Sequence, residues 1–370
     1  MILGVTEEQQ ELREAVRRFL ADRCPLPRVR ELMETDEGWD LEVWQLAAKL
    51  GLQGIAIAEE YGGAGSTFAE QAIVLEEMGA ALYGGPYLAS AVLAATALAA
   101  TGDDAACRDY LPGIAGGELI GTLAVTEDDG SWQPDGSTLA ASPDGDGWKL
   151  TGHKSYVLDG HTAGLILVIG RTADGLSLFA VSADADGLAR SVLPTMDQTR
   201  KLARLEFSST PARLVGTEGA AGVVLERVLD VAAIALAAEQ LGGAQRALDM
   251  AVSYAKVRHQ FGRPIGSFQA IKHKCADLLL EVESLRSAVG YAAAAVAEDS
   301  TEVPTLAALV QGYASEAYFH VAAENIQIHG GIGFTWEHDA HLYFKRAKSS
   351  ELFLGDASYH RERLATRIGL

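Results

Sequence analysis

The chain has 370 residues, of which 48% are hydrophobic and 22% are charged. Fifty Asp and Glu residues against 30 Lys and Arg residues give a formal net charge of -20 at pH 7. This charge repels nucleic-acid phosphates unless a local basic patch is present, and the sequence has no such patch. The apolar content is sufficient for a large core and for two or three domains. We therefore expect an ordinary globular protein with no nucleic-acid partner.

The cysteines and the apolar stretches indicate the compartment. Cys24, Cys107 and Cys275 are far apart and form no disulfide framework and no CxxC motif, which is typical of a reducing compartment. We expect them to be small buried apolar residues. The start, MILGVTEEQQELREAV, turns acidic after five residues, unlike a signal peptide. The longest apolar stretches, such as ASAVLAATALAA, are too short to span a bilayer. These features predict a cytoplasmic protein with no membrane partner.

Helical periodicity dominates residues 7 to 117. Apolar residues recur at spacings of three and four in LREAVRRFLADR and FAEQAIVLEEMGAALYG, and Gly-rich breaks such as YGGAGS separate these segments. This pattern predicts an N-terminal helical domain over residues 1–120.

The pattern changes between residues 122 and 209. Short runs rich in Val, Ile, Leu and Phe follow one another, namely WKLTGHKSYVL, GLILVIGRT, LSLFAVSA and ARLEFS, and Gly-Asp or Asp-Gly turns divide them. These runs are typical of strands. We predict a small, barrel-like middle β domain over residues 121–212.

Long helical segments return in the C-terminal part of the chain. They cover residues 223–258, 267–297, 302–329 and 338–350, and Ser267 and Thr301 stand where N-caps are expected. Four such helices predict a C-terminal four-helix bundle domain over residues 213–370. The fold class is therefore mainly α with a central β domain.

Two junctions carry chemically suggestive residues. In YAKVRHQFGRPIGSFQ, the turn leaves Arg258 and Gln260 able to reach a phosphate or ribose and Phe261 able to cover a flat ring. A capped interhelical turn accounts for the same residues. In ENIQIHGGIGF, the glycines allow backbone N–H groups to approach a pyrophosphate. This segment follows a helix instead of a strand, so it is not a Rossmann fingerprint.

Five motifs in order make nearly the whole chain resemble the acyl-CoA dehydrogenase family. They are AEEYGGAG at 58–65, LAVTEDDGS at 123–131, LTGHKSYVLDG at 150–160, RHQFGRPIGSFQ at 258–269 and QIHGGIGF at 327–334. The resemblance implies the family's acyl-CoA dehydrogenase-like fold, with a helical N-terminal domain, a β domain and a C-terminal four-helix bundle. It also implies FAD as cofactor, an acyl-CoA thioester as substrate and electron-transfer flavoprotein as electron acceptor.

The resemblance further implies which residues contact FAD. In the family, the flavin lies between the β domain and the bundle, and the adenosine end reaches a neighbouring subunit, so an oligomer is implied, arranged as a dimer of dimers. The positions that match the family's FAD contacts are Val125, Thr126, Ser131, Tyr156, Val157, Leu158, Arg258, Gln260, Phe261, Gln269, Gln327, Gly330, Gly331 and Asp356. The family's Trp-x-Thr beside the flavin is replaced by Tyr156, Val157 and Leu158, which removes a hydroxyl group.

The family's catalytic base is absent from this chain. α,β-Dehydrogenation needs a base that removes the α-proton of the thioester. The family places a Glu in the turn after the last long bundle helices, between an aromatic residue and Gly, and this position is Leu354. The alternative family position, on the first bundle helix, is Ala232. Glu351, three residues before Leu354, is the candidate for a displaced base.

Two functions remain open on the sequence. The first is a subunit of a heteromeric acyl-CoA dehydrogenase for fatty acyl or steroid side-chain thioesters, whose homologous partner supplies the Glu. The second is a self-sufficient flavoenzyme with the displaced base Glu351, and a non-catalytic subunit that binds FAD and acyl-CoA is a further alternative. His338, Asp339 and His341 in WEHDAHLYFKR predict a polar helix face or a subunit contact, and we expect no metal site.

Overall fold

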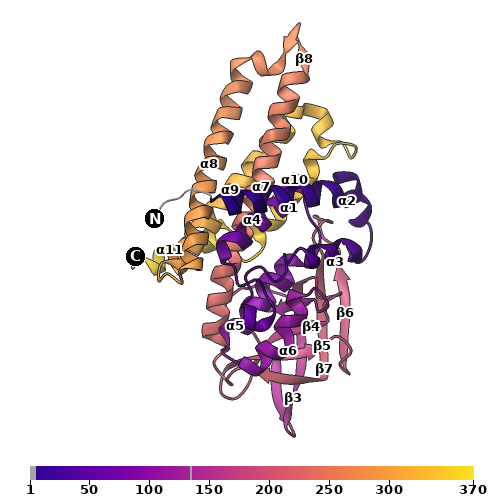
Figure 1. The fold of residues 1–370 in the computed structure, drawn as a ribbon, viewed down its shortest axis with the longest axis vertical. Coiled ribbons are helices and arrows are strands. Elements are labelled where there is room, and N and C mark those ends of the chain that lie inside the picture. Colours follow the sequence, from indigo (N-terminus) through magenta and orange to yellow (C-terminus); the bar gives the residue numbers. More distant parts are fainter. Residues whose placement is uncertain (1–5, 134–135) are drawn as a thin grey trace. The chain divides into compact units, whose positions relative to one another are not determined.

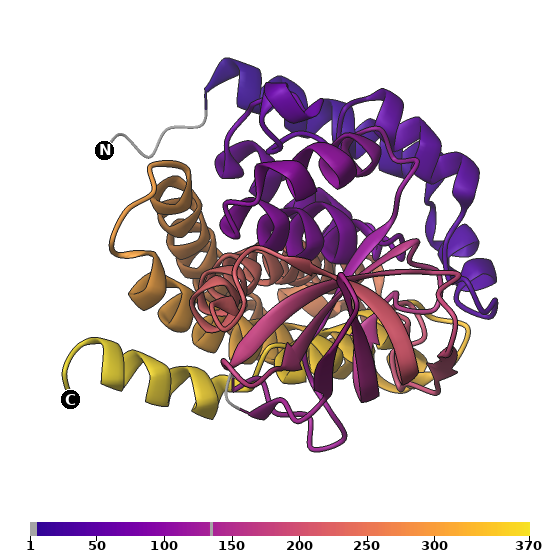
Figure 2. The ribbon, with the colours of Figure 1, turned by 90° about the horizontal axis from the view of Figure 1, so that it is seen from below.

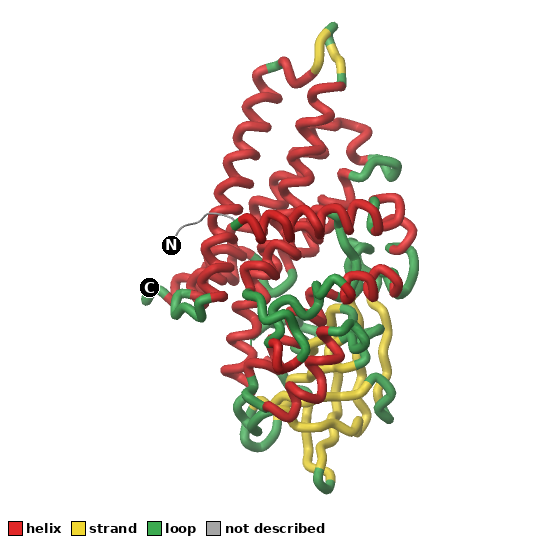
Figure 3. Tube along the Cα trace, viewed as in Figure 1, coloured by secondary structure: helices red, strands yellow, loops and turns green. Residues whose placement is uncertain are grey.

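The computed structural model describes residues 6–133 and 136–370. These residues form two compact units. The helical unit comprises residues 6–30, 68–83 and 233–370, and the strand unit comprises residues 31–67 and 84–232. Figure 3 distinguishes the helices from the strands by colour. The prediction of a mainly α chain with a central β domain is confirmed.

The helical unit is built around long antiparallel helices. It contains α1 (Glu7–Arg23), α2 (Leu26–Leu32, cut by the unit boundary), α4 (Phe68–Ala80), the C-terminal part of α7 (Ala221–Val257), α8 (Gln269–Ala297), α9 (Val303–His329), α10 (Ala340–Leu352) and α11 (Ala357–Arg367). α9 packs against α8, α10 and α11. A short hairpin, β8 (His259–Gln260) with β9 (Arg263–Pro264), lies at the far end of α7 and α8 (Figure 1). The four predicted bundle helices are confirmed to within a few residues.

The predicted N-caps of two bundle helices are wrong. α8 begins after Phe268 and α9 begins after Glu302, and neither helix has a side-chain cap hydrogen bond. The hydroxyl group of Ser267 donates instead to the carbonyl oxygen of Pro264, because a 3-10 turn over Ile265–Ser267 precedes α8. Pro304 near the start of α9 suits the first turn of a helix, where a missing N–H costs nothing.

The strand unit combines short helices with one sheet. Its helices are α3 (Leu41–Lys49), η1 (Glu59–Tyr61), the π-helix η2 (Leu88–Ala94), α5 (Ala95–Ala100), α6 (Asp104–Ala115) and the N-terminal part of α7. Its strands are β1 (Gly121–Ala124), β2 (Ala140–Asp144), β3 (Gly147–Leu158), β4 (Leu165–Arg171), β5 (Leu176–Ser182), β6 (Leu188–Leu193) and β7 (Leu202–Val215). The predicted strands are confirmed.

The sheet closes on itself around an apolar core. Its strand order is β1-β4-β2-β3-β7-β5, β5 pairs again with β4, and β6 pairs with β7. The strands lie side by side in Figure 2. The core contains Ile166, Phe179 and Leu205. These side chains alternate along β4, β5 and β7 with residues that point to the other face of the sheet. The barrel-like topology arises from this closed pairing.

Two glycines allow α4 and α7 to approach closely in the helical unit. A Cβ atom at Gly242 would lie 1.7 Å from the carbonyl oxygen of Glu76, and one at Gly79 would lie 1.9 Å from that of Glu239. Backbone atoms cannot move aside as a flexible side chain can, so any side chain here forces the helices apart.

We expect Gly242→Ala to lower the free energy of unfolding by about 3 kcal/mol, at the upper end of the cost of overpacking a core. Gly290→Ala is the matched control, because Gly290 is an exposed position inside α8 with no atom within 4 Å of the added Cβ. The control should raise stability by up to about 1 kcal/mol, since alanine favours the helix. Urea unfolding of both variants measures these changes, and equal effects would show that the crossing tolerates a side chain.

The expectation that the cysteines are buried holds for two of the three. Cys24 and Cys107 are buried, Cys275 is half-buried, and none of the three forms a disulfide among the described residues. Within residues 6–133 and 136–370, no helix is long and apolar enough to cross a membrane.

Candidate functional site

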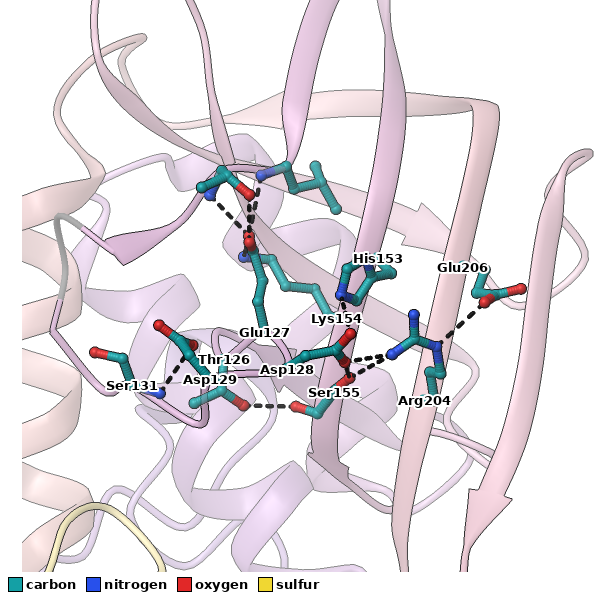
Figure 4. A network of polar contacts seen from close by, with 12 residues as sticks. Thr126, Glu127, Asp128, Asp129, Ser131, His153, Lys154, Ser155, Arg204 and Glu206 are labelled. Atoms are coloured by element: carbon teal, nitrogen blue, oxygen red, sulfur yellow. Dashed lines mark hydrogen bonds and ion pairs between the residues drawn. The ribbon is translucent and has the colours of Figure 1, made fainter.

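In the strand unit, hydrogen bonds from side-chain hydroxyl groups to backbone carbonyl oxygens join β1 and the residues after it to β3. Within the described residues, β1 pairs as a strand only with β4. The hydroxyl group of Thr122 donates to the carbonyl oxygen of Leu158 at 2.6 Å, and that of Thr126 donates to Ser155 O at 2.5 Å. The backbone N–H of Ser155 donates to Thr126 O at 2.9 Å. β1 and the residues directly after it are thus fixed on β3 on both sides of Tyr156, and Figure 4 shows the contact between Thr126 and Ser155.

A buried ion pair lies beneath this junction. Lys154 is 0% exposed, and its Nζ lies 3.0 Å from Glu127 Oε1. Burial lowers the pKa of Lys154 to about 8, although the charge of Glu127 opposes this shift. Burial raises the pKa of Glu127, but hydrogen bonds from Thr138 and the charge of Lys154 outweigh it and lower the pKa to about 2. Both groups are therefore charged at pH 7.

A second polar network covers the outer side of the same junction. Asp128 accepts a hydrogen bond from the hydroxyl group of Ser155 at 2.6 Å and forms an ion pair with Arg204. His153 Nε2 lies 3.1 Å from Asp128 Oδ2. The hydrogen bond from Ser155 and the neighbouring Arg204 lower the pKa of Asp128, against a smaller opposing effect of burial. Figure 4 shows these side chains converging on Ser155.

The segment after Ser155 presents one aromatic ring outward. Tyr156 has a φ of 59° at a bulge between β3 and β7, and it is exposed, with Gly130 beside its ring. Val157 and Leu158 are buried. Val125 and Thr126 are buried as well, whereas Ser131 lies in the loop after them and its backbone N–H donates to Asp129. The residues predicted from LAVTEDDGS and LTGHKSYVLDG thus lie along one junction.

In the helical unit, the hairpin at the end of α7 and α8 carries exposed polar and aromatic groups. Arg258, Gln260 and Gln269 are exposed, and Phe261 is 91% exposed with a φ of 55°. The Arg258 guanidinium makes no ion pair with any of the described residues. Phe268 holds the hairpin from below, because its ring contacts both Phe261 and the guanidinium of Arg263.

The end of α9 presents open backbone. Gly330 has a φ of 65°, and no atom lies within 4 Å of a Cβ added at Gly330 or Gly331. Gln327 is exposed on the last turn of the helix. The buried ring of His329 stacks on Tyr254 at 4.2 Å and anchors this turn to α7. A guanidinium without an ion-pair partner among the described residues, amide side chains, an exposed aromatic ring and open glycine backbone suit the pyrophosphate and rings of a dinucleotide.

The turn between α10 and α11 holds Leu354 in a conformation that side chains rarely adopt. Leu354 has a φ of 65° and is 2% exposed. Gly355 has a φ of 100°, and an added Cβ there would lie 2.2 Å from the ring of Tyr359. Asp356 caps α11 by accepting a hydrogen bond from the backbone N–H of Tyr359 at 2.8 Å. The turn is therefore closely specified although its central side chain is aliphatic.

The other candidate base positions lie elsewhere. Glu351 is in the last turn of α10, half-buried, and its carboxylate pairs with Lys348 Nζ at 3.0 Å. Ala232 is fully buried in α7. The described residues contain no carboxylate at either position that matches the family's base.

The cluster in WEHDAHLYFKR forms contacts within the chain. Arg30 pairs with Asp339 at 2.8 Å and donates to the carbonyl oxygen of His338 at 3.0 Å. His341 stacks on Trp336 at 4.8 Å. Among the described residues, no group of three His, Cys, Asp or Glu side chains is arranged to hold a metal ion.

Lys154, Glu127 and Asp128 were not among the residues predicted from the sequence. A signal for Lys154 was available, since it lies an even number of residues after the buried Leu150 on β3 and is charged where an inward-facing apolar residue is expected.

A cavity of about 410 Å³ lies within the helical unit, lined by Leu20, Glu77 and Arg246 among others. None of the predicted site residues lines it.

The fold and these motifs define a class of flavin-associated dehydrogenases, and comparison with known proteins establishes it. The chain belongs to the acyl-CoA dehydrogenase family. Residues 6–118 match the model of the acyl-CoA dehydrogenase N-terminal domain, and residues 221–369 match that of the C-terminal domain. Members of this family generally bind FAD.

Individual relatives cover the whole chain. It is 38% identical over 363 residues to the acyl-CoA dehydrogenase IpdE2 of Mycobacterium tuberculosis, covering 98% of each chain. It also resembles a solved variant of the steroid ACAD Tcur3481-Tcur3483, with 35% identity, a TM-score of 0.89 and coverage of 99% and 98%. The ChsE4-ChsE5 complex from Mycobacterium tuberculosis contains a chain with 32% identity, a TM-score of 0.91 and coverage of 100% and 99%.

Proposed function

We propose that this chain is an FAD-binding subunit of an acyl-CoA dehydrogenase and that a homologous partner supplies the catalytic Glu. The observation that carries the proposal is Leu354, an aliphatic side chain at the family's base position, in a turn with positive φ at both Leu354 and Gly355. The family's activity is α,β-dehydrogenation of an acyl-CoA thioester, which needs a proton acceptor that leucine does not provide.

The residues of the chain fit FAD. Arg258 and Gln260 would bind the ADP half with Gln269, and Gln327 with the backbone of Gly330 and Gly331 would bind the pyrophosphate. Thr126, Tyr156 and the backbone of residues 157–158 would lie against the flavin ring. Bound FAD would supply the acceptor for the hydride that leaves the β-carbon of the thioester. The net charge of -20 makes the unpaired Arg258 the natural partner of an anionic pyrophosphate.

Two similar proteins support a two-chain assembly. ChsE4-ChsE5 is a complex, and Tcur3481-Tcur3483 is a steroid ACAD. We therefore extend the proposal to a heteromer, a dimer of dimers, that oxidises a bulky thioester of the steroid side-chain or fatty acyl class. Electron-transfer flavoprotein is the proposed electron acceptor.

A displaced base is the second candidate function. Glu351 lies in the last turn of α10, three residues before Leu354, and its carboxylate pairs with Lys348 Nζ at 3.0 Å. This ion pair directs the carboxylate of Glu351 along the surface of α10. A base must come within hydrogen-bond reach of the α-proton, so we favour the partner-supplied Glu. A non-catalytic subunit that binds FAD and acyl-CoA is the remaining alternative.

We expect Arg258→Ala to lower flavin occupancy at least about tenfold, because a charge-assisted bidentate contact is lost. The helical fold should persist, since the side chain is exposed and unpaired among the described residues. Lys256→Ala, an exposed cation two residues earlier, is the matched control. The ratio of flavin to protein absorbance measures occupancy. Fully loaded Arg258→Ala protein would contradict the assignment.

A further inference from the structure

We propose that Lys154 is a positioning residue for the flavin: it holds the Val125–Thr126 segment against β3 and so sets the surface on which the flavin ring rests. This inference depends on the proposed FAD binding. Lys154 does not contact the flavin in this account, since it is fully buried. It acts through the backbone of residues that are proposed to contact the flavin.

The ammonium group of Lys154 has three acceptors within hydrogen-bond distance. Nζ lies 2.8 Å from Val125 O, 3.0 Å from Glu127 Oε1 and 2.7 Å from Ser137 Oγ. An ammonium group has three donors and no acceptor, so these contacts use its whole capacity. The Val125 carbonyl lies just beyond β1, and Thr126 follows it directly. Lys154 therefore fixes the peptide that orients Thr126.

Glu127 connects this arrangement to the far end of the following loop. Its Oε1 accepts hydrogen bonds from the backbone N–H groups of Thr138 and Leu139, at 2.8 and 3.0 Å. The Thr138 hydroxyl group donates to the other carboxylate oxygen. The residue that begins the loop thus binds the residues that end it. Lys154 and Glu127 together set where the loop that contains Gly130 and Ser131 starts and finishes.

The ion pair of Lys154 and Glu127 lies where β1 and β3 approach each other without strand pairing. No β1–β3 strand pairing occurs within the described residues, and side-chain-to-backbone bonds take its place. Tyr156 then turns outward at φ 59°, two residues after Lys154. The same short stretch of β3 therefore supplies the buried ammonium and the exposed ring. A shift of the backbone at Lys154 therefore also moves the ring of Tyr156.

Three variants test the proposal on the flavin-loaded protein, with its partner chain if the two purify together. The double variant Glu127→Gln/Lys154→Met removes both charges at similar volume, which avoids an unpaired buried carboxylate. Ser137→Ala is the mildest change, because it keeps both charges; it removes one acceptor of Lys154 and the contacts of the same hydroxyl group with Ile169 O and Glu127 Oε1. Lys149→Met is the control, because Lys149 is on the same strand but half-exposed and paired with Asp144 at 3.0 Å.

The readouts are the FAD dissociation constant, the band shape and circular dichroism of the bound flavin, and the melting temperature. We expect the dissociation constant to rise about fivefold for Ser137→Ala, which corresponds to one net hydrogen bond, and more for the double variant. The flavin spectrum should change in both. The control should keep its affinity within twofold and its spectrum unchanged.

Two results would overturn the positioning role. One is a Ser137→Ala or double variant that melts earlier but keeps the unmodified dissociation constant and flavin spectrum, because the pair would then be purely structural. The other is an equal loss in Lys149→Met. If the double variant does not fold, the result for Ser137→Ala alone tests the positioning role. Failure of the unmodified protein to bind FAD, with or without a partner, would instead contradict the proposed function itself.

Discussion

Leu354→Glu is expected to let this chain, without a partner, bleach its flavin with saturated acyl-CoA thioesters about 10²- to 10⁴-fold faster than the unmodified protein. The turn already has the backbone that the substitution needs, with φ 65° at Leu354 and 100° at Gly355. The new carboxyl group enters a site that is 2% exposed, so desolvation raises its pKa. The rate should therefore increase with pH as the carboxyl group ionises.

Leu352→Glu is the matched control for this gain of activity. Leu352 ends α10 two residues earlier and is exposed, so it adds a carboxylate nearby without placing it in the turn. Anaerobic stopped-flow absorbance with short-chain, long-chain and steroid side-chain thioesters measures both variants. A folded, flavin-loaded Leu354→Glu protein that bleaches no faster than Leu352→Glu would show that residue 354 does not face the α-carbon.

Arg346→Met is expected to lower the free energy of unfolding by about 3–5 kcal/mol, because it removes the buried cation that pairs with the buried carboxylate of Glu239. Arg346 Nη1 lies 2.7 Å from Glu239 Oε1, and the side chains are 3% and 10% exposed. This pair joins α10 to α7 inside the helical unit. The turn that carries Leu354 begins at the end of α10, so loss of the pair also weakens the support of that turn.

An exposed ion pair provides the comparison. Arg361 and Glu316 form an ion pair with side chains 58% and 54% exposed. Solvent screens such a pair, so Arg361→Met should leave the unfolding midpoint almost unchanged. The double variant Glu239→Gln/Arg346→Met should recover most of the stability lost in Arg346→Met. Equal urea midpoints for Arg346→Met and Arg361→Met would contradict the role of burial.

Periodicity was sufficient to predict the long bundle helices and the strands β3, β4, β5 and β7, because each of these has one face or stripe in a core. Segments such as 302–329 contain a long apolar pattern that only a buried helix explains, and α9 occupies Val303–His329. Local capping was harder to predict. Ser267 has the right side chain for an N-cap, but the preceding 3-10 turn uses its hydroxyl group and shifts the helix start by a residue.

Candidate site residues could be predicted from the sequence only where they belong to a family motif. Arg258, Gln327 and Gly330 follow from family motifs, and the structure places them on exposed ends of the bundle helices. Lys154 was not predicted, because its partners come from residues 125–139 and depend on the closure of the sheet. The left-handed backbone of Leu354 was also beyond the sequence, since leucine has no preference for that conformation.

Anaerobic mixing of the unmodified chain with acyl-CoA thioesters, alone and with a Glu-bearing homologous chain, tests whether a partner supplies the catalytic base. We expect the chain alone to bleach its flavin very slowly or not at all, and the partner to restore rapid bleaching. Rapid bleaching by the chain alone would contradict it. If Glu351→Gln then abolished that bleaching, Glu351 would be the base and the chain would be a self-sufficient enzyme.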